Sequence, residues 1–387
     1  MTARNVRGGQ PRVLHILEAV GGGTLRHIVD LVQTVSGVEH HVVIPPDPSV
    51  AGVHASSADG EFVQEISKAG ATIHRLPMVR NPLHPKNYLG ILKLRKLLDE
   101  VRPVAVHGHS SVGGAFARAA AAGTKVPVVY TPHGLATHRS ILWVEKLLAP
   151  LTHRFIAVSQ SEGDRLCTLG ISTEEKVVVI PNGVDLDPPE ELPFDLRREL
   201  HLPADTNIVG TVARLVEQKA PLDYVKTCKE IHRSRGDVHF VLIGSGVLQH
   251  QVDAAVKSAG LRPFFHHIPF LSHAFHAIEQ FNVFLLGSLF EGAPYTPLEA
   301  MRAGVPVVLS NVAGNRDTIE HDVSGLLFPF GDTSAMAQGV LNLLSNAQLR
   351  DSLSDAARIR LKEHFDVEEM GASLNAFYLS LLAGPRR

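Results

Sequence analysis

Two carboxylates, Glu291 and Glu299, stand eight residues apart in the stretch 288–308, SLFEGAPYTPLEAMRAGVPVV. Glu291 follows an apolar run typical of a buried strand and lies in a turn with Gly292 and Pro294. In an open α/β sheet, the end of a strand faces the edge where ligands bind. The helix start that follows offers free N–H groups and a positive dipole end, which suit a phosphate. The stretch therefore predicts a site for an anionic ligand rich in hydroxyl groups.

Glu299 also has a purely structural interpretation. Thr296 would be the N-cap of a helix, and Pro297 would be its first residue. Glu299 would then be the third helical residue and would complete a capping box with Thr296. A glutamate in that position bonds to the backbone and needs no ligand. Both interpretations of Glu299 stay open from these residues alone.

Arg214 and Lys219 stand five residues apart, just after the predicted strand 208–213. A guanidinium fork and a nearby ammonium can neutralise a diphosphate and stabilise its departure. An ordinary charged surface loop is the alternative interpretation of this pair.

Three glycines, Gly21 to Gly23, follow a predicted strand at 13–17 and precede a predicted helix at 24–35. Glycines in this place allow the backbone to approach a ligand closely, because no Cβ intervenes. The dinucleotide pattern requires a further glycine where Arg26 stands. The run thus predicts a close backbone approach and argues against a nicotinamide enzyme.

Histidines follow two other predicted strands. His133 precedes Gly134 after the strand 126–131, and His107 and His109 lie at the end of the strand 104–107. The chain has 22 histidines, so a structural role is the alternative for each of them.

Strands and helices alternate along the chain, which is typical of doubly wound parallel sheets. A proline-rich acidic run after Asp185 interrupts the alternation, which then restarts at 208. We therefore expect an α/β protein with two Rossmann-like domains facing each other across a cleft. The expected parts are an N-terminal domain at 1–186, a linker at 187–206, a C-terminal domain at 207–360, and a helical segment at 361–387 that can pack back on the first domain.

Composition limits the function. The 387 residues carry a formal net charge of −2, which gives no basic footprint for nucleic acid. The first 186 residues hold 19 Lys and Arg against 15 Asp and Glu, a balance of +4 that is compatible with an anionic membrane surface. Cys167 and Cys228 match no metal or redox spacing. We find no signal peptide and no transmembrane stretch, and we expect a cytoplasmic protein.

Taken together, these motifs resemble the GT-B glycosyltransferases, specifically the large family 4 of retaining enzymes. The resemblance runs nearly end to end, and its specificity comes from the order and spacing of the motifs. They are Gly21-Gly22-Gly23, His133-Gly134, Ile180-Pro181-Asn182-Gly183-Val184-Asp185, Val212-Ala213-Arg214 with Lys219, Gly244-Ser245-Gly246, the pair Glu291 and Glu299, and Ser324-Gly325-Leu326-Leu327-Phe328-Pro329.

The resemblance implies roles for individual residues. Glu299 would accept the ribose hydroxyls of a nucleotide, and Glu291 would approach the donor sugar. Arg214, Lys219 and His133 would complete the catalytic set, and His107 and His109 would line the acceptor side. The remaining donor-binding residues would be Gly22, Gly23, Gly244, Gly292, Ala293, Pro294 and Tyr295.

No metal or other cofactor is expected. Asp185-Leu186-Asp187 has the form of a metal–diphosphate motif but lies in the linker, and the paired histidines at 40–41 and 266–267 lack companion ligands. The chain departs from the family pattern at Ala293-Pro294, where Phe-Gly is commoner, and at Ala220, where Gly is usual. It departs again at Asn315-Arg316-Asp317, which replaces a segment ending in Glu. These departures leave the nucleotide base and the sugar undefined.

The expected function is transfer of a sugar, with retention of configuration, from a UDP- or GDP-type nucleotide sugar to a hydroxyl acceptor in surface polysaccharide or glycolipid assembly. The acceptor can be an oligosaccharide or lipid-linked, and peripheral membrane contact is compatible with the helix that carries Trp143. The alternatives are a non-catalytic nucleotide-sugar-binding protein and another GT-B enzyme such as a nucleotide-sugar epimerase. Oligomeric state is left undefined.

Overall fold

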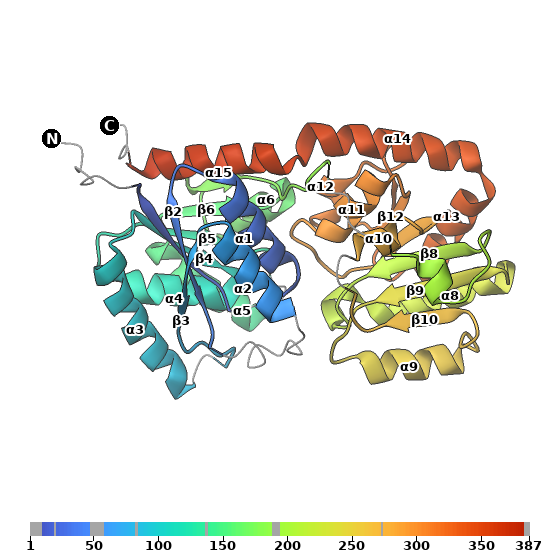
Figure 1. The fold of residues 1–387 in the computed structure, drawn as a ribbon, viewed down its shortest axis with the longest axis horizontal. Coiled ribbons are helices and arrows are strands. Elements are labelled where there is room, and N and C mark those ends of the chain that lie inside the picture. The colour runs from blue at the N-terminus through green and yellow to red at the C-terminus, as the bar shows by residue number, and fades with distance from the viewer. Residues whose placement is uncertain are drawn as a thin grey trace. The chain divides into compact units, whose positions relative to one another are not determined.

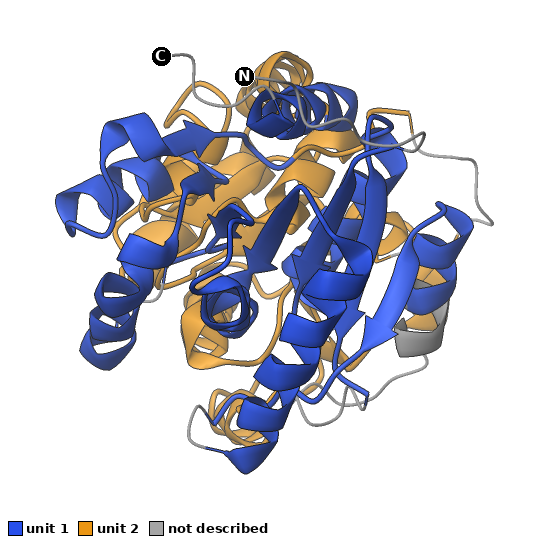
Figure 2. Ribbon diagram, turned by 90° about the vertical axis from the view of Figure 1, so that its left-hand side faces the viewer, with its two compact units in different colours: residues 1–182, 367–387 blue, residues 183–366 orange. Residues whose placement is uncertain are grey.

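The protein folds into two compact α/β units, each with its own parallel sheet. A computed structural model describes residues 10–18, 21–46, 58–81, 84–135, 138–187, 194–271 and 274–382. Unit 1 comprises residues 1–182 and 367–387, and unit 2 comprises residues 183–366 (Figure 2). The chain therefore leaves unit 1 after Asn182 and returns to it at Val367. Part of the proline-rich run expected as a linker, residues 188–193, lies outside the described residues.

Unit 1 contains a seven-stranded sheet in the order β3-β2-β1-β4-β5-β6-β7, and all neighbouring strands are parallel. The strands are short runs rich in valine and isoleucine, as expected where both faces of a sheet are covered. They are β1 (Arg12–Ile16), β2 (Glu39–Ile44), β3 (Thr72–Arg75), β4 (Ala105–His109), β5 (Val128–Thr131), β6 (Arg154–Ala157) and β7 (Val177–Val179).

Helices connect these strands, as Figure 1 shows. They are α1 (Gly22–Thr34), α2 (Ala58–Lys68), α3 (Pro85–Val101), α4 (Ser110–Ala121), α5 (Arg139–Leu148) and α6 (Gln160–Thr168), with short 3-10 turns η2 (Ala149–Leu151) and η3 (Glu174–Lys176). The last helix, α15 (Val367–Leu382), packs against α1 although the two are far apart in sequence. Its buried Met370, Leu374 and Phe377 belong to the same apolar core as Ile28 and Leu31 of α1.

Unit 2 repeats this architecture with six parallel strands in the order β10-β9-β8-β11-β12-β13. The strands are β8 (Asn207–Val212), β9 (Val238–Ile243), β10 (Phe265–Ile268), β11 (Val283–Leu286), β12 (Val307–Ser310) and β13 (Leu326–Phe328). The helices are α7 (Leu196–Glu199), η4 (Glu217–Lys219), α8 (Pro221–Ser234), α9 (Gln249–Ser258), α10 (Phe275–Ile278), α11 (Tyr295–Ala303), α12 (Asn315–Thr318), α13 (Thr333–Ser345) and α14 (Ala347–His364).

Each sheet reverses its strand order once, between β1 and β4 in unit 1 and between β8 and β11 in unit 2. The loops that leave the carboxyl ends of two such strands run in opposite directions, which opens a crevice for a ligand. The expected fold, two Rossmann-like doubly wound sheets, is therefore confirmed. Among the described residues, none of the helices is both long enough and apolar enough to span a membrane.

Candidate functional site

In unit 2, the predicted residues gather at the strand-order reversal. Val209 and Gly210 of β8 pair with Val283 and Phe284 of β11. The loop after β8 carries Arg214 and Lys219, and the loop after β11 carries Glu291. The parallel pairing thus brings together two loops that are more than 70 residues apart in sequence.

Lys219 and Glu291 form a direct ion pair. Lys219 Nζ lies 2.6 Å from Glu291 Oε1, and the side chains are 15% and 5% exposed. A charge-assisted hydrogen bond at this distance, largely removed from water, is stronger than a surface ion pair. The pair places one cation and one carboxylate together at the ligand edge of the sheet.

Backbone contacts hold the two loops against each other. The Gln218 side chain donates to the carbonyl of Phe290 at 3.1 Å, and the N–H of Leu289 donates to the carbonyl of Gln218 at 2.8 Å. Both bonds involve residues just before Lys219 and Glu291 in sequence, so they join the two loops next to the ion pair. The position of Glu291 is therefore fixed by the main chain as well as by its ion pair.

The loop of Glu291 is also bound to the end of β12. The Glu291 N–H donates to the carbonyl of Ala313 at 3.3 Å, and Ser310 Oγ donates to the carbonyl of Ser288 at 2.6 Å. Gly314 has a φ of 82°, and a Cβ there would lie 2.5 Å from the carbonyl oxygen of Gly292. A glycine is required at 314 because both the backbone conformation and the close approach exclude a side chain.

Arg214 is exposed and precedes the short turn η4, which ends at Lys219 and has Ala220 as its C-cap. Ala220 has a φ of 47°, in the left-handed region that disfavours residues with a Cβ. This explains why glycine is usual at the matching family position. Gly244, predicted to bind the donor, follows β9, and a Cβ there would lie 2.1 Å from the carbonyl oxygen of Ala213. Gly244 therefore lets the ends of β8 and β9 pack closely.

The start of α11 differs from the predicted one. The helix begins at Tyr295 with Pro294 as its N-cap and no side-chain cap bond. The predicted capping box of Thr296 and Glu299 is therefore wrong. Pro297 does not fix the first helical position, because every N–H of the first turn lacks an intrahelical partner and proline is tolerated throughout it.

The other residues predicted to bind the donor lie at this helix start. Gly292, Ala293, Pro294 and Tyr295 are buried around it, and Glu299 lies one turn into α11 and is partly exposed. The N–H groups of a first helical turn point towards the helix N-terminus, where an anion can bind. The site in unit 2 thus combines a helix N-terminus, a buried Lys–Glu pair and a second carboxylate.

In unit 1, Gly22 and Gly23 form the exposed first turn of α1, after the end of β1. Thr24 Oγ1 of that helix lies 3.3 Å from Ser110 Oγ at the start of α4. The glycine turn and the end of β4 are thus neighbours, as the strand order of the sheet requires.

Behind this edge lies a continuous chain of four histidines. His133 Nε2 lies 3.0 Å from His109 Nδ1, His109 Nε2 lies 3.2 Å from His15 Nδ1, and His15 Nε2 lies 3.1 Å from His40 Nδ1. His40 Nε2 ends the chain 2.8 Å from the carbonyl oxygen of Val35. Strands β1, β2 and β4 and the loop after β5 each contribute one ring.

These hydrogen bonds have one direction. A carbonyl oxygen only accepts, so the proton of the terminal bond is on His40 Nε2. When all four rings are neutral, each further bond must have an Nε2–H donor and an Nδ1 acceptor. Burial lowers the pKa of all four histidines below its usual value near 6.5, and neighbouring histidines lower the pKa further in His15, His109 and His133. The rings are therefore neutral at pH 7.

Two further histidines flank the chain. His107 is fully buried, with Nδ1 2.7 Å from the Tyr378 hydroxyl and Nε2 2.8 Å from Thr131 Oγ1. The structure thus places His107 in the interior of unit 1. His27 of α1 is also fully buried, and its Nδ1 lies 3.0 Å from Asn182 Oδ1.

The loop that carries His133 is strained and clamped. His133 has a φ of 57° and Gly134 a φ of 101°. The buried carboxylate of Glu162 accepts the Gly134 N–H at 2.6 Å and the Val158 N–H at 2.9 Å, and Arg165 donates to the carbonyl of Leu135 at 2.9 Å. Burial raises the pKa of Glu162 above its usual value, and the backbone N–H groups that donate to this carboxylate offset only part of that rise. Non-glycine residues with positive φ persist where surrounding contacts enforce them, often at functional sites.

Glu162, His15 and His27 were not predicted, and His40 was considered only in its pair with His41, as a ligand without companions. For Glu162 a signal existed, since Ser159 and Glu162 have capping-box spacing and Ser159 does cap α6. His15 interrupts an otherwise apolar strand, which marks a buried polar group. The contacts of His27 and His40 depend on the packing of distant segments.

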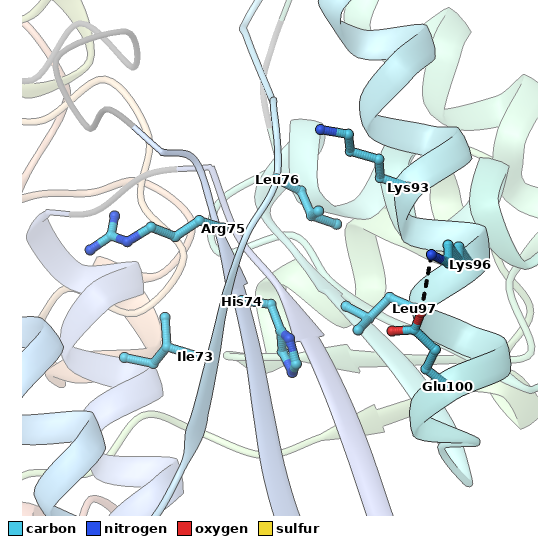
Figure 3. A pocket seen from close by; sticks show the side chains of 8 residues that line it. All are labelled: Ile73, His74, Arg75, Leu76, Lys93, Lys96, Leu97 and Glu100. Atoms are coloured by element: carbon cyan, nitrogen blue, oxygen red, sulfur yellow. Dashed lines mark ion pairs between the residues drawn. The ribbon is translucent and has the colours of Figure 1, made fainter.

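A pocket outside these sites lies between the edge strand β3 and α3 (Figure 3). Its volume is about 480 Å³, and Arg75, Lys93 and Lys96 line it, with Lys96 paired to Glu100 at 3.6 Å. His74 and Leu76 point towards α3 in this view. None of the predicted site residues lines the pocket, so we do not assign the transfer site to it.

The helix α5 has the reverse of the usual amphipathic pattern. Its acidic residue Glu145 is buried and accepts from Arg118 at 2.8 Å and from the Tyr130 hydroxyl at 2.9 Å. Trp143 and Leu147 are 65% and 60% exposed. The exposed surface of α5 is thus apolar, and its flanking charges, Arg139 and Lys146, are basic.

Two family descriptions match the two halves of the chain. Glycosyltransferase Family 4 matches residues 21–188, and Glycosyl transferases group 1 matches residues 194–360. The first match covers strands β2 to β7 of unit 1, and the second covers all six strands of the sheet in unit 2.

Individual proteins are similar over most of the chain. An Escherichia coli UDP-Gal:alpha-D-GlcNAc-diphosphoundecaprenol alpha-1,3-galactosyltransferase is 28% identical over 326 residues, which cover 79% of this chain and 82% of the relative. The Staphylococcus aureus capsular polysaccharide biosynthesis glycosyltransferase CapM is 24% identical over 344 residues, covering 85% and 90%.

Among solved structures, Anabaena HepE in complex with UDP and glucose superposes with a TM-score of 0.80 at 18% identity, covering 96% of this chain and all of that one. This likeness concerns the fold. The structural likeness shows the GT-B fold, and the two family matches show the family. The chain therefore belongs to the GT-B glycosyltransferases of family 4, also described as group 1.

Proposed function

We propose that the protein is a retaining glycosyltransferase that moves a sugar from a UDP- or GDP-type nucleotide sugar to a hydroxyl acceptor without a metal ion. The observation that carries this proposal is the buried Lys219–Glu291 pair at the ligand edge of unit 2, 2.6 Å apart. A cation in this position can take up the charge that develops on a departing nucleotide diphosphate.

The donor-binding roles follow the chemistry of the groups. The first turn of α11 and the side chains of Lys219 and Arg214 supply positive potential for the diphosphate. Glu299 can accept two ribose hydroxyls, and Glu291 is proposed to approach the sugar. His133 of unit 1 is proposed to contact the reacting sugar, as the family resemblance implies.

Retention of configuration is proposed to follow a front-face route. A double displacement needs a nucleophilic carboxylate on the face opposite the leaving group. Glu291 is held by Lys219 and by the backbone of its own loop, an arrangement that favours a fixed electrostatic role. In the proposed route the leaving phosphate accepts the proton of the acceptor hydroxyl as the new glycosidic bond forms.

The proposed acceptor is a sugar on a lipid diphosphate, used in polysaccharide or glycolipid assembly at the cytoplasmic membrane face. The apolar exposed surface of α5, where Trp143 and Leu147 share the helix with Arg139 and Lys146, supports contact with an anionic membrane surface. The name of the E. coli relative, which specifies a diphosphoundecaprenol acceptor, supports the same class of acceptor.

The donor and the catalytic pair are tested together. Thermal shifts with UDP, GDP and ADP identify the base, and transfer is then measured in the presence of a chelator.

We expect Lys219→Met and Glu291→Gln each to lower kcat by about 100-fold or more while the fold is retained. Lys226→Met is the matched control, because Lys226 is exposed and pairs only with Asp223 among the ion pairs of the described residues. Near-normal turnover in either site variant would refute the assignment.

Product analysis separates the alternative functions. An inverted anomeric centre would refute retention, and a donor isomer formed without acceptor would identify an epimerase. Nucleotide-sugar binding without turnover under any acceptor condition would identify a binding protein.

Membrane contact is tested with the α5 surface. We expect the double variant Trp143→Ser, Leu147→Ser to lose on the order of tenfold in affinity for anionic phospholipid vesicles in a sedimentation assay. Val247→Ser is the control, because Val247 is 78% exposed but lies in unit 2. Equal vesicle binding by all three proteins would contradict a role of α5.

A further inference from the structure

Three histidines converge beside the glycine turn of unit 1. They are His27 on α1, His109 at the end of β4, and His133 in the loop after β5. One ring nitrogen of each lies within 4.8 Å of a ring nitrogen of the other two. His27 and His109 are fully buried, whereas His133 is partly exposed.

Two of the three histidines already present a nitrogen with a lone pair. His27 donates through Nδ1 to Asn182 Oδ1, so its buried Nε2 is unprotonated, and it has no hydrogen-bond partner among the described residues. His109 Nδ1 is an acceptor because the hydrogen-bond chain that begins at the carbonyl of Val35 fixes its tautomer. A neutral imidazole with its other nitrogen bonded is the form that binds metal ions.

The third nitrogen needs only a tautomer change. His133 Nε2 lies 3.0 Å from His109 Nδ1 and donates the proton of that bond. Nitrogens bound to one tetrahedral zinc ion lie about 3.3 Å apart, given Zn–N distances near 2.0–2.1 Å. A metal ion at this position takes the place of the shared proton, which moves through solvent to His133 Nδ1, so that the ring stays neutral.

We propose that His27, His109 and His133 form a binding site for a divalent transition-metal ion of the zinc class. The three imidazoles provide nitrogen ligands, and water or another ligand would take the fourth position of a tetrahedral ion. Asn182 and His15 are the outer partners that orient His27 and His109.

A second group of histidines, His15, His107 and His109, also lies close together. Both nitrogens of His107 are bonded, to Thr131 and Tyr378, and both nitrogens of His15 are bonded, to His40 and His109. Metal binding there would break several buried hydrogen bonds. The group with the unpartnered His27 nitrogen is therefore the better site.

Metal bound here would occupy His133. This consequence rests on the proposed function, in which His133 contacts the reacting sugar. Metal-free transfer at unit 2 and inhibition by zinc at unit 1 are then compatible properties of one chain.

The site is tested by metal binding alone, in protein without a polyhistidine tag. Co²⁺ should give the intense visible absorption of tetrahedral coordination with one ion per chain, and Zn²⁺ should displace it and raise the unfolding temperature of the protein. His27→Gln, whose amide can still donate to Asn182, should abolish both effects. His107→Gln is the matched control and should keep them.

Different failures have different meanings. Octahedral or multi-site cobalt binding, or tetrahedral binding retained in His27→Gln, would overturn the proposal, and so would loss of the site in His107→Gln alone.

Transfer assays then compare rates with and without zinc. We expect zinc to inhibit the unsubstituted protein and to leave the rate of His27→Gln unchanged relative to its own zinc-free rate. Tetrahedral cobalt bound through His27 without any inhibition by zinc would instead contradict the proposed role of His133 in transfer.

Discussion

Single residues in this protein hold unfavourable backbone conformations next to the proposed site. Ala220 adopts a φ of 47° directly after Lys219. A Cβ in this region costs roughly 1–2 kcal/mol, whereas glycine loses only about 0.5–1 kcal/mol of extra chain entropy on folding. We expect Ala220→Gly to raise the unfolding free energy by up to about 1 kcal/mol in denaturant titrations.

The control for this substitution is Ala356→Gly, in the interior of the right-handed helix α14. There the same chemical change should lower the unfolding free energy by about 1 kcal/mol. Equal effects of the two substitutions would show that backbone strain at Ala220 is not significant.

Glu162 acts on His133 through the backbone. Its two oxygens accept the N–H groups of Gly134 and Val158. In Glu162→Gln, one acceptor becomes an amide donor and leaves a buried N–H unpaired, so we expect a loss of about 1–3 kcal/mol in stability. Transfer should fall as the loop of His133 loosens, and added donor should not restore it. Glu174→Gln, at an exposed position, should change neither stability nor kcat.

The position of Lys219 and Glu291 at the edge of the sheet in unit 2 could be predicted from the sequence, but their mutual contact could not. Glu291 and Lys219 each follow a recognisable strand, so their place at the sheet edge follows from strand order. Their 2.6 Å contact spans 72 residues and depends on the pairing of β8 with β11. The capping box at Thr296 failed because proline marks the first helical turn without fixing a position within it.

At the scale of elements, α5 depends on one buried ion pair. Arg118 of α4 and Glu145 of α5 are 0% and 2% exposed in their side chains and 2.8 Å apart. Removing one partner leaves an uncompensated buried charge, so we expect Glu145→Ala to cost about 3–5 kcal/mol. The double variant Arg118→Met, Glu145→Leu removes both charges and should recover most of that loss in thermal unfolding. A double variant as unstable as the single one would show that the pair itself is stabilising.

This pair also explains why the sequence pattern of α5 was ambiguous. The apolar content of this ten-residue helix is compatible both with a buried position and with the membrane contact suggested by Trp143. The buried acid determines which side faces inward, and its partner Arg118 lies 27 residues earlier in the chain. The alternation of strands and helices, by contrast, was sufficient to predict both sheets.

At the scale of the whole molecule, the two units have separate cores, and unit 1 uses both ends of the chain. Leu374 of α15 is fully buried in the core of unit 1, and Leu343 of α13 is fully buried in that of unit 2. Truncating a buried leucine to alanine typically costs about 2–5 kcal/mol. We expect Leu374→Ala to speed amide hydrogen exchange in β1 and β4, and Leu343→Ala to speed it in β8 and β11. Faster exchange in both sheets with either variant would show that the two units unfold as one.

The return of the chain to unit 1 at Val367 has a consequence for biosynthesis. On the ribosome, the strands of unit 1 emerge before unit 2, but the helix that completes their core and supplies the Tyr378 hydroxyl to His107 emerges only after unit 2. At translation rates of roughly 5–20 residues per second, the first sheet waits about 10–40 s for that helix. Unit 2 is continuous in sequence, so its residues are all available before those of the first unit are. During synthesis, the first sheet therefore exposes part of its apolar core, and we expect this segment to be the one that binds chaperones or aggregates.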